Sequence, residues 1–142
     1  MKALISRRRA LSRFLPTVCV LLWVSAFVAT HVPARRVPPT QFSDKTLHAV
    51  GYFALGVAFL MAMWSRGVSS RTRAVVAACV IPAYGALDEL TQPLVNRTAA
   101  WSDWAADLVG AAAAITALEG VLWLMRRFGG ARRGVDGSPG PK

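Results

Sequence analysis

The sequence predicts an all-α membrane protein, a four-transmembrane-helix bundle with both termini cytoplasmic. Three observations predict it. Apolar residues make up 54% of the chain and are concentrated in four long runs. Each run approaches the roughly 20 residues that a helix needs to cross a bilayer core. Basic residues gather on alternate connections, as positively charged cytoplasmic loops do. A chain of 142 residues has room for one such bundle and for no separate catalytic domain.

The predicted helices follow the apolar runs Phe14–Val32, Thr46–Trp64, Ala74–Leu94 and Trp104–Met125. The first run is expected to stay as an anchor, because it is longer than the about 7–15 apolar residues of a secretory signal peptide. Ser43 and Ser102 are placed to cap the second and fourth helices. Cys19 and Cys79 lie inside apolar runs, so we expect free thiols and no disulfide framework.

The distribution of charge predicts the topology. Of the 17 Lys and Arg residues, 13 lie before the first run, between the second and third, or after the fourth. This asymmetry predicts both termini in the cytoplasm and two loops on the outer side. The sequence divides into a basic cytoplasmic tail (1–13), a four-helix membrane domain (14–127, with its motif-bearing core at 43–114) and a disordered basic tail (128–142). The net charge of +10 is interpreted as setting the topology and contacting anionic lipid. No nucleic-acid-binding module is recognisable.

Ionisable residues cluster near the predicted outer ends of the last three runs. A spacing of four residues places side chains on one helix face. Such polar faces are predicted for Asp44, His48 and Tyr52, for Tyr84, Asp88 and Gln92, and for Asp103 and Asp107.

Four of these groups lie a turn or more inside apolar sequence: His48, Asp88, Glu89 and Asp107. Burying such groups in a membrane costs several kcal/mol unless they are paired, so they indicate a functional site. The alternative is that they mark the water boundary or hold the helices together. Glu119, near the other side, is interpreted as structural, paired with Arg126, Arg127 or another inner-leaflet cation.

Three segments, "SDKTLHAVGYFALG", "AYGALDELTQPLVNR" and "SDWAADLVGA", resemble the VanZ-like family of small bacterial membrane proteins. The resemblance covers residues 43–114 and implies a four-helix fold and an association with teicoplanin resistance, without supplying a reaction. Two features depart from the family pattern: Asp107 stands where Asn is common, and "PLVNR" replaces an aromatic-Pro-Gly run. The motif positions carried over are Asp44, Lys45, His48, Tyr52, Glu89, Gln92, Arg97, Asp103, Asp107 and Gly110.

The leading hypothesis is an outward-facing polar pocket on the second to fourth helices for a membrane lipid or a lipid-linked cell-wall precursor. His48 and Glu89 are the candidate catalytic acid–base pair. Lys45 and Arg97 are suited to hold phosphate or carboxylate. The candidate ligand-binding set is Asp44, Lys45, Tyr52, Asp88, Gln92, Arg97, Asp103 and Asp107.

Two further interpretations remain open at this stage. The carboxylates and His48 offer oxygen and nitrogen ligands suited to a divalent metal, although no metal-site spacing is present. In the second interpretation, the chain is a non-catalytic membrane adaptor or an ion- or proton-coupled protein, and the acidic cluster is structural. Cofactor, reaction and oligomeric state are left open.

Overall fold

The computed structural model describes residues 2–33, 36 and 41–129, and in this part of the chain every regular element is helical. The elements are α1 (Lys2–Thr30), α2 (Asp44–Ser65), α3 (Ser70–Thr91), the short 3₁₀ helix η2 (Gln92–Val95) and α4 (Trp101–Gly129). All four α-helices are long and apolar enough to cross a membrane, as in a multi-pass membrane protein. The all-α prediction is confirmed at this level.

Two predicted segments differ from the elements observed. α1 begins at Lys2, so the predicted N-terminal tail is helical and continuous with the first membrane helix. α4 continues to Gly129, so the first two residues of the predicted disordered tail belong to a helix. The rest of that tail, 130–142, lies outside the described residues, as do 34–35 and 37–40 of the first loop.

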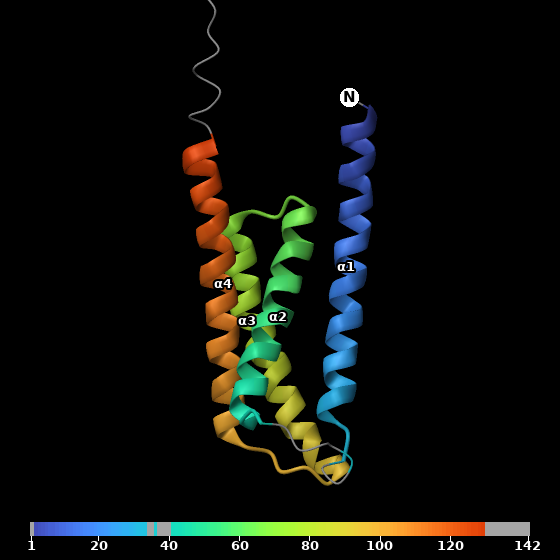
Figure 1. Ribbon diagram of the computed structural model, residues 1–142, viewed down its shortest axis with the longest axis vertical. Coiled ribbons are helices and arrows are strands. Elements are labelled where there is room, and N and C mark those ends of the chain that lie inside the picture. The colour runs from blue at the N-terminus through green and yellow to red at the C-terminus, as the bar shows by residue number, and fades with distance from the viewer. Residues whose placement is uncertain (1, 34–35, 37–40, 130–142) are drawn as a thin grey trace, which may run out of the picture.

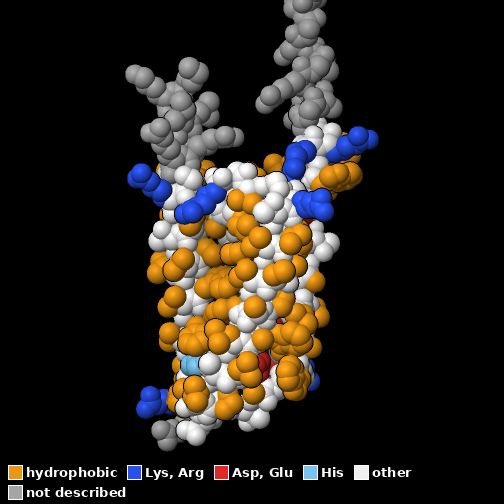
Figure 2. All heavy atoms as spheres, turned by 180° about the vertical axis from the view of Figure 1, so that it is seen from behind, with side chains coloured by type: hydrophobic (Ala, Val, Ile, Leu, Met, Phe, Trp, Pro, Cys, Tyr) orange, Lys and Arg blue, Asp and Glu red, His pale blue; other side chains and the backbone are white. Residues whose placement is uncertain are grey.

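The four helices form one bundle in which α2 contacts each of the other three. The α1–α2 and α3–α4 connections lie at one end of the bundle, at the bottom of Figure 1. The α2–α3 turn lies at the other end, with the first residue of α1 and the last of α4. Figure 2 shows a band of apolar side chains between these two ends, with several Lys and Arg side chains around the second.

Serine hydroxyls cap α2 and α3. Ser43 Oγ accepts from the backbone N–H of Thr46 at 3.2 Å, which confirms the predicted cap of α2. Ser69 caps α3 in the same way. The predicted Ser102 cap is wrong, because α4 begins at Trp101 and Ser102 lies within its first turn. The Ser102 hydroxyl instead donates to the neighbouring Asp103 carboxylate at 3.2 Å.

Small residues bring α2 and α4 into close contact. A Cβ atom at Gly110 would lie 2.2 Å from the backbone oxygen of Ala49, and one at Gly56 would lie 2.7 Å from Ala114 Cβ. Lipid tails are as apolar as the helix surfaces, so helices in a membrane associate through such close packing. This contact sets the distance between α2 and α4 directly beside the polar layer described below.

A partly buried ion pair joins α3 to α4 near the α2–α3 turn. The Arg73 guanidinium donates to both oxygens of Glu119, at 2.9 Å in each case, and Ser70 donates to the same carboxylate. Arg73 also donates to the carbonyl of Val68 at 2.5 Å. The structure thus bears out a structural partner for Glu119 and identifies it as Arg73.

Gly110→Ala is expected to destabilise the bundle by about 1–3 kcal/mol, because the added methyl group must displace the backbone of α2. Reversible unfolding in mixed micelles measures this change. Gly120→Ala is the matched control in the same helix, since a Cβ there meets nothing within 4 Å. Equal stability of the two variants would contradict the close packing described here.

Candidate functional site

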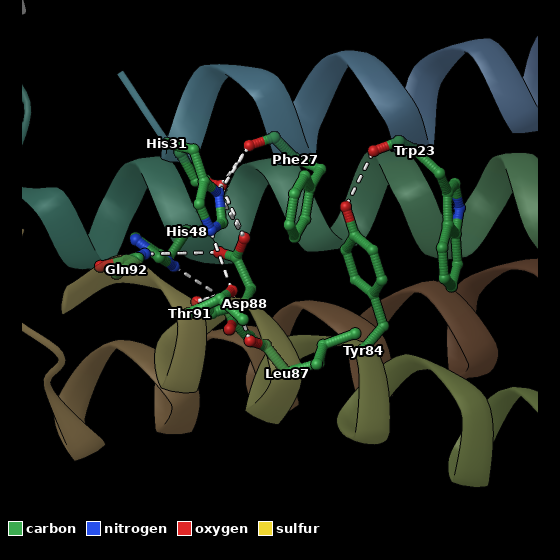
Figure 3. A network of polar contacts seen from close by, with 11 residues as sticks. Trp23, Phe27, His31, His48, Tyr84, Leu87, Asp88, Thr91 and Gln92 are labelled. Atoms are coloured by element: carbon green, nitrogen blue, oxygen red, sulfur yellow. Dashed lines mark hydrogen bonds and ion pairs between the residues drawn. The ribbon is translucent and has the colours of Figure 1, made fainter. Parts of the chain in front are cut away.

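A layer of buried polar side chains lies at the end of the bundle that holds the α1–α2 and α3–α4 connections. It is built from the end of α1, the beginning of α2, the end of α3 and the beginning of α4. Figure 3 shows His31, His48, Asp88 and Gln92 gathered between these helices. The buried members of the layer are His48, Asp88, Glu89, Gln92, Asp103 and Asp107.

His48 and Asp107 join α2 to α4. His48 Nδ1 lies 2.9 Å from Asp107 Oδ1, and the Asp107 side chain is 1% exposed. Gly85 of α3 makes room for this pair, because a Cβ there would lie 2.9 Å from Asp107 Oδ2 and 3.2 Å from Tyr52 Cε1. The pair is therefore enclosed by three helices.

Asp88 belongs to a separate network that links α3 to α1. Its Oδ1 accepts a hydrogen bond of 2.6 Å from Thr30, and its Oδ2 accepts one of 3.4 Å from Gln92. His31 Nδ1 lies 3.6 Å from Oδ1, and His31 Nε2 lies 2.9 Å from the hydroxyl of Thr91. Both oxygens of this buried carboxylate therefore have protein partners.

Glu89 connects the end of α3 to the beginning of α4. Its Oε2 accepts from the backbone N–H of Ala100 at 2.8 Å, which places a carboxylate at the N-terminus of α4. The helix dipole favours a negative charge at this position. Three buried atoms in the described part of the chain have no hydrogen-bond partner: Glu89 Oε1, Asp107 Oδ2 and the Tyr52 hydroxyl.

A pocket of about 330 Å³ opens between α1 and α2 beside this layer. Its polar lining comes from Thr30, Asp44, His48, Tyr52 and Arg97. The remaining lining is small or apolar, and consists of Ala26, Ala29, Leu47, Gly51 and Leu55. The pocket thus combines an apolar wall with one guanidinium, one carboxylate, one imidazole and two hydroxyl groups.

The structure divides the predicted site residues into groups. His48, Glu89, Asp103 and Asp107 lie in the buried layer. Asp88 and Gln92 bond each other and belong with α1. Tyr52 and Arg97 line the pocket together with Asp44 and His48. Lys45 is exposed, and no described residue is seen to bond its side chain.

The helices that form the pocket differ from those expected. The sequence places the pocket on the second to fourth helices, whereas α1 and α2 supply its walls and Arg97 follows η2. Thr30 and His31 were missed because they end a run that was interpreted as a plain anchor. Their signal was a histidine beside a threonine at the C-terminal end of that run.

Two sets of side chains have the donor atoms and spacing of a metal site. One donor atom from each of Asp44, His48 and Asp103 lies within 4.8 Å of the other two. The same holds for His48, Glu89 and Asp107, all of which are buried. His48 is common to both sets, so they describe alternative uses of one imidazole.

The chain was compared with protein-family models, with curated proteins and with solved structures, and none of them matches.

Thr30→Val is expected to lower stability by about 1–3 kcal/mol, because it leaves a buried carboxylate oxygen without its closest donor. Thr116→Val is the matched control, since Thr116 is exposed and bonds only its own helix backbone, at Ala112. Unfolding in mixed micelles measures both variants. A loss no larger than that of the control would show that Asp88 does not depend on α1.

Proposed function

We propose that this chain is a VanZ-like protein of a bacterial inner membrane, with both termini in the cytoplasm. In this proposal it binds an anionic lipid or a lipid-linked cell-envelope ligand from the outer leaflet. The observation that carries the proposal is the pocket between α1 and α2, with Arg97 among its lining residues. The family assignment rests on the three motifs quoted above, and a link to glycopeptide resistance rests on that resemblance alone.

The pocket suits an amphipathic, anionic molecule. Arg97 makes no ion pair with any described carboxylate, so its guanidinium is available for a phosphate or carboxylate group. Ala26, Ala29 and Leu55 offer an apolar wall on which an acyl or isoprenoid chain can lie. A Cβ at Gly51 would meet nothing within 4 Å, so the wall is open at that position.

The lining also contains groups that can move protons. His48 lines the pocket, and its Nδ1 is held by Asp107, an arrangement that orients an imidazole for general acid–base work. Glu89 lies close to this pair in the same layer. Binding is the function that the geometry supports best, and His48 with Glu89 stays the predicted pair for any reaction on the bound ligand.

A second candidate is a non-catalytic membrane adaptor, in which the polar layer serves to hold the helices together. The Asp88 network favours this candidate, because both carboxylate oxygens are used within the protein and the network ties α1 to α3. It accounts less well for Arg97, which lines a pocket without an ion-pair partner among the described residues.

Binding is tested with purified protein in lipid nanodiscs or detergent. We expect phosphatidylglycerol or a lipid-linked cell-wall precursor to raise the thermal unfolding temperature, and phosphatidylcholine to have little effect. Arg97→Gln should weaken the stabilising ligand about 10- to 100-fold, because it removes a charge-assisted contact. Gly51→Leu should fill the pocket and reduce binding without disturbing its neighbours.

Arg127→Gln is the control, because Arg127 is an exposed residue near the C-terminal end of α4. Equal loss in the Arg97 and Arg127 variants would indicate non-specific attraction to charge. No stabilisation of the wild type by any of these ligands, in a protein that unfolds cooperatively, would favour the adaptor.

The proposed topology is tested by cysteine labelling in intact cells, in a background without Cys19 and Cys79. The Thr98→Cys variant should react with a membrane-impermeant maleimide, since the α3–α4 connection is proposed to face outward. The Ser69→Cys variant should react only after the cells are permeabilised. The reverse pattern would place the termini and the α2–α3 turn outside.

A further inference from the structure

We propose that His48, Glu89 and Asp107 form a buried binding site for one divalent transition-metal ion of the Zn²⁺ class. The proposal does not rest on the lipid ligand suggested above. It concerns the interior of the polar layer, where α2, α3 and α4 each contribute one ligand.

The spacing of the three groups fits a single ion. One donor atom from each residue lies within 4.8 Å of the other two. Zn²⁺ holds imidazole nitrogen and carboxylate oxygen at about 2.0–2.2 Å, so two of its ligands lie within about 4.4 Å of each other. His48 Nδ1 and Asp107 Oδ1 are hydrogen-bonded at 2.9 Å, so a bound tetrahedral ion would replace this hydrogen bond and hold the two atoms about 3.4 Å apart.

Unpartnered oxygen atoms provide the second, independent observation. Asp107 Oδ2 and Glu89 Oε1 are both buried and have no hydrogen-bond partner. Their residues are 1% and 7% exposed, respectively. A buried carboxylate oxygen without a donor is costly, and a bound cation satisfies such atoms directly.

The charge balance of the layer points the same way. Glu89 and Asp107 bring two carboxylates into a poorly hydrated interior, and no described Lys or Arg pairs with either of them. An uncompensated charge in a membrane interior costs several kcal/mol. One divalent cation with neutral His48 neutralises both carboxylates.

Asp88 shows that burial alone does not make a ligand. Asp88 and Asp107 are each 1% exposed and lie in the same layer. Both oxygens of Asp88 accept hydrogen bonds from Thr30 and Gln92, whereas only one oxygen of Asp107 has a partner. The proposal therefore assigns a metal to Asp107 and none to Asp88.

The alternative set of Asp44, His48 and Asp103 is a weaker candidate for the site. Asp44 is exposed, and the Asp103 carboxylate already accepts from Ser102 at 3.2 Å. Neither carboxylate contributes an unpartnered buried atom. A mixed imidazole and carboxylate donor set suits Zn²⁺ or Mn²⁺ better than Mg²⁺ or Ca²⁺, which prefer oxygen ligands alone.

The site also adjoins the pocket through His48, which lines it. Tyr52 lines the same pocket and has a buried hydroxyl without a hydrogen-bond partner. An ion held by three protein ligands retains an open coordination position, as catalytic zinc sites do.

The test uses the full chain, purified in detergent, stripped with a chelator and dialysed. Zn²⁺, Mn²⁺, Mg²⁺ and Ca²⁺ are then added separately as simple salts. Metal content is measured by mass spectrometry and affinity by calorimetry, with thermal unfolding as a further readout. We expect one equivalent of Zn²⁺ per chain, weaker Mn²⁺ binding, and an increase in unfolding temperature on Zn²⁺ addition.

The decisive variants are Asp107→Asn and Glu89→Gln, with Asp88→Asn as the matched buried control. The first two should weaken Zn²⁺ binding by about 100-fold or more, since changes even to groups behind the ligands cost 10- to 100-fold. Asp88→Asn should bind Zn²⁺ as the wild type does. The proposal is overturned if the wild type binds no stoichiometric metal, or if Asp107→Asn binds as tightly as Asp88→Asn. The wild-type measurement can overturn the proposal by itself, so the test remains valid even if a variant misfolds.

Discussion

The close packing of α2 on α4 is the constraint on which the polar layer depends. Gly110 lets the backbone of α2 approach α4, and a side chain there would overlap the oxygen of Ala49. This approach brings His48 within 2.9 Å of Asp107, at the end of the bundle that holds the α1–α2 and α3–α4 connections. Gly85 allows α3 to cover the same pair. Close packing at these two glycines thus encloses the His48–Asp107 pair inside an apolar bundle.

The two ends of the bundle differ in how their buried charged groups are compensated. Near the α2–α3 turn, Glu119 has a bidentate partner in Arg73, and the guanidinium also reaches a backbone carbonyl. At the other end, Glu89 and Asp107 have no such cation among the described residues and leave oxygen atoms unpartnered. The first arrangement is a closed structural contact, whereas the second is one that a ligand can complete.

α1 has a larger part in the site than an anchor would. Thr30 supplies the shortest hydrogen bond to Asp88, and Ala26 and Ala29 form part of the pocket wall. Tyr84 donates to the carbonyl of Trp23 at 2.8 Å, which fastens α3 to α1 further along the bundle (Figure 3). Because α1 closes the pocket on one side, movement of this helix would change access to His48 and Arg97.

The sequence by itself determined the four apolar helices and the polar-layer residues that α2, α3 and α4 contribute, but not Thr30 and His31 at the end of α1. Long apolar runs leave few alternatives to helices in a bilayer, and four-residue spacing places side chains such as His48 and Tyr52 on one face. Only the tertiary structure decided which partner each of these similar carboxylates has. Asp88 turns to Thr30 on α1, whereas Asp107 meets His48 on α2. That division depends on how the helices are rotated and on contacts between distant parts of the chain. Thr30 and Asp88 are separated by 58 positions, and His48 and Asp107 by 59. Local sequence patterns carry no information about such contacts.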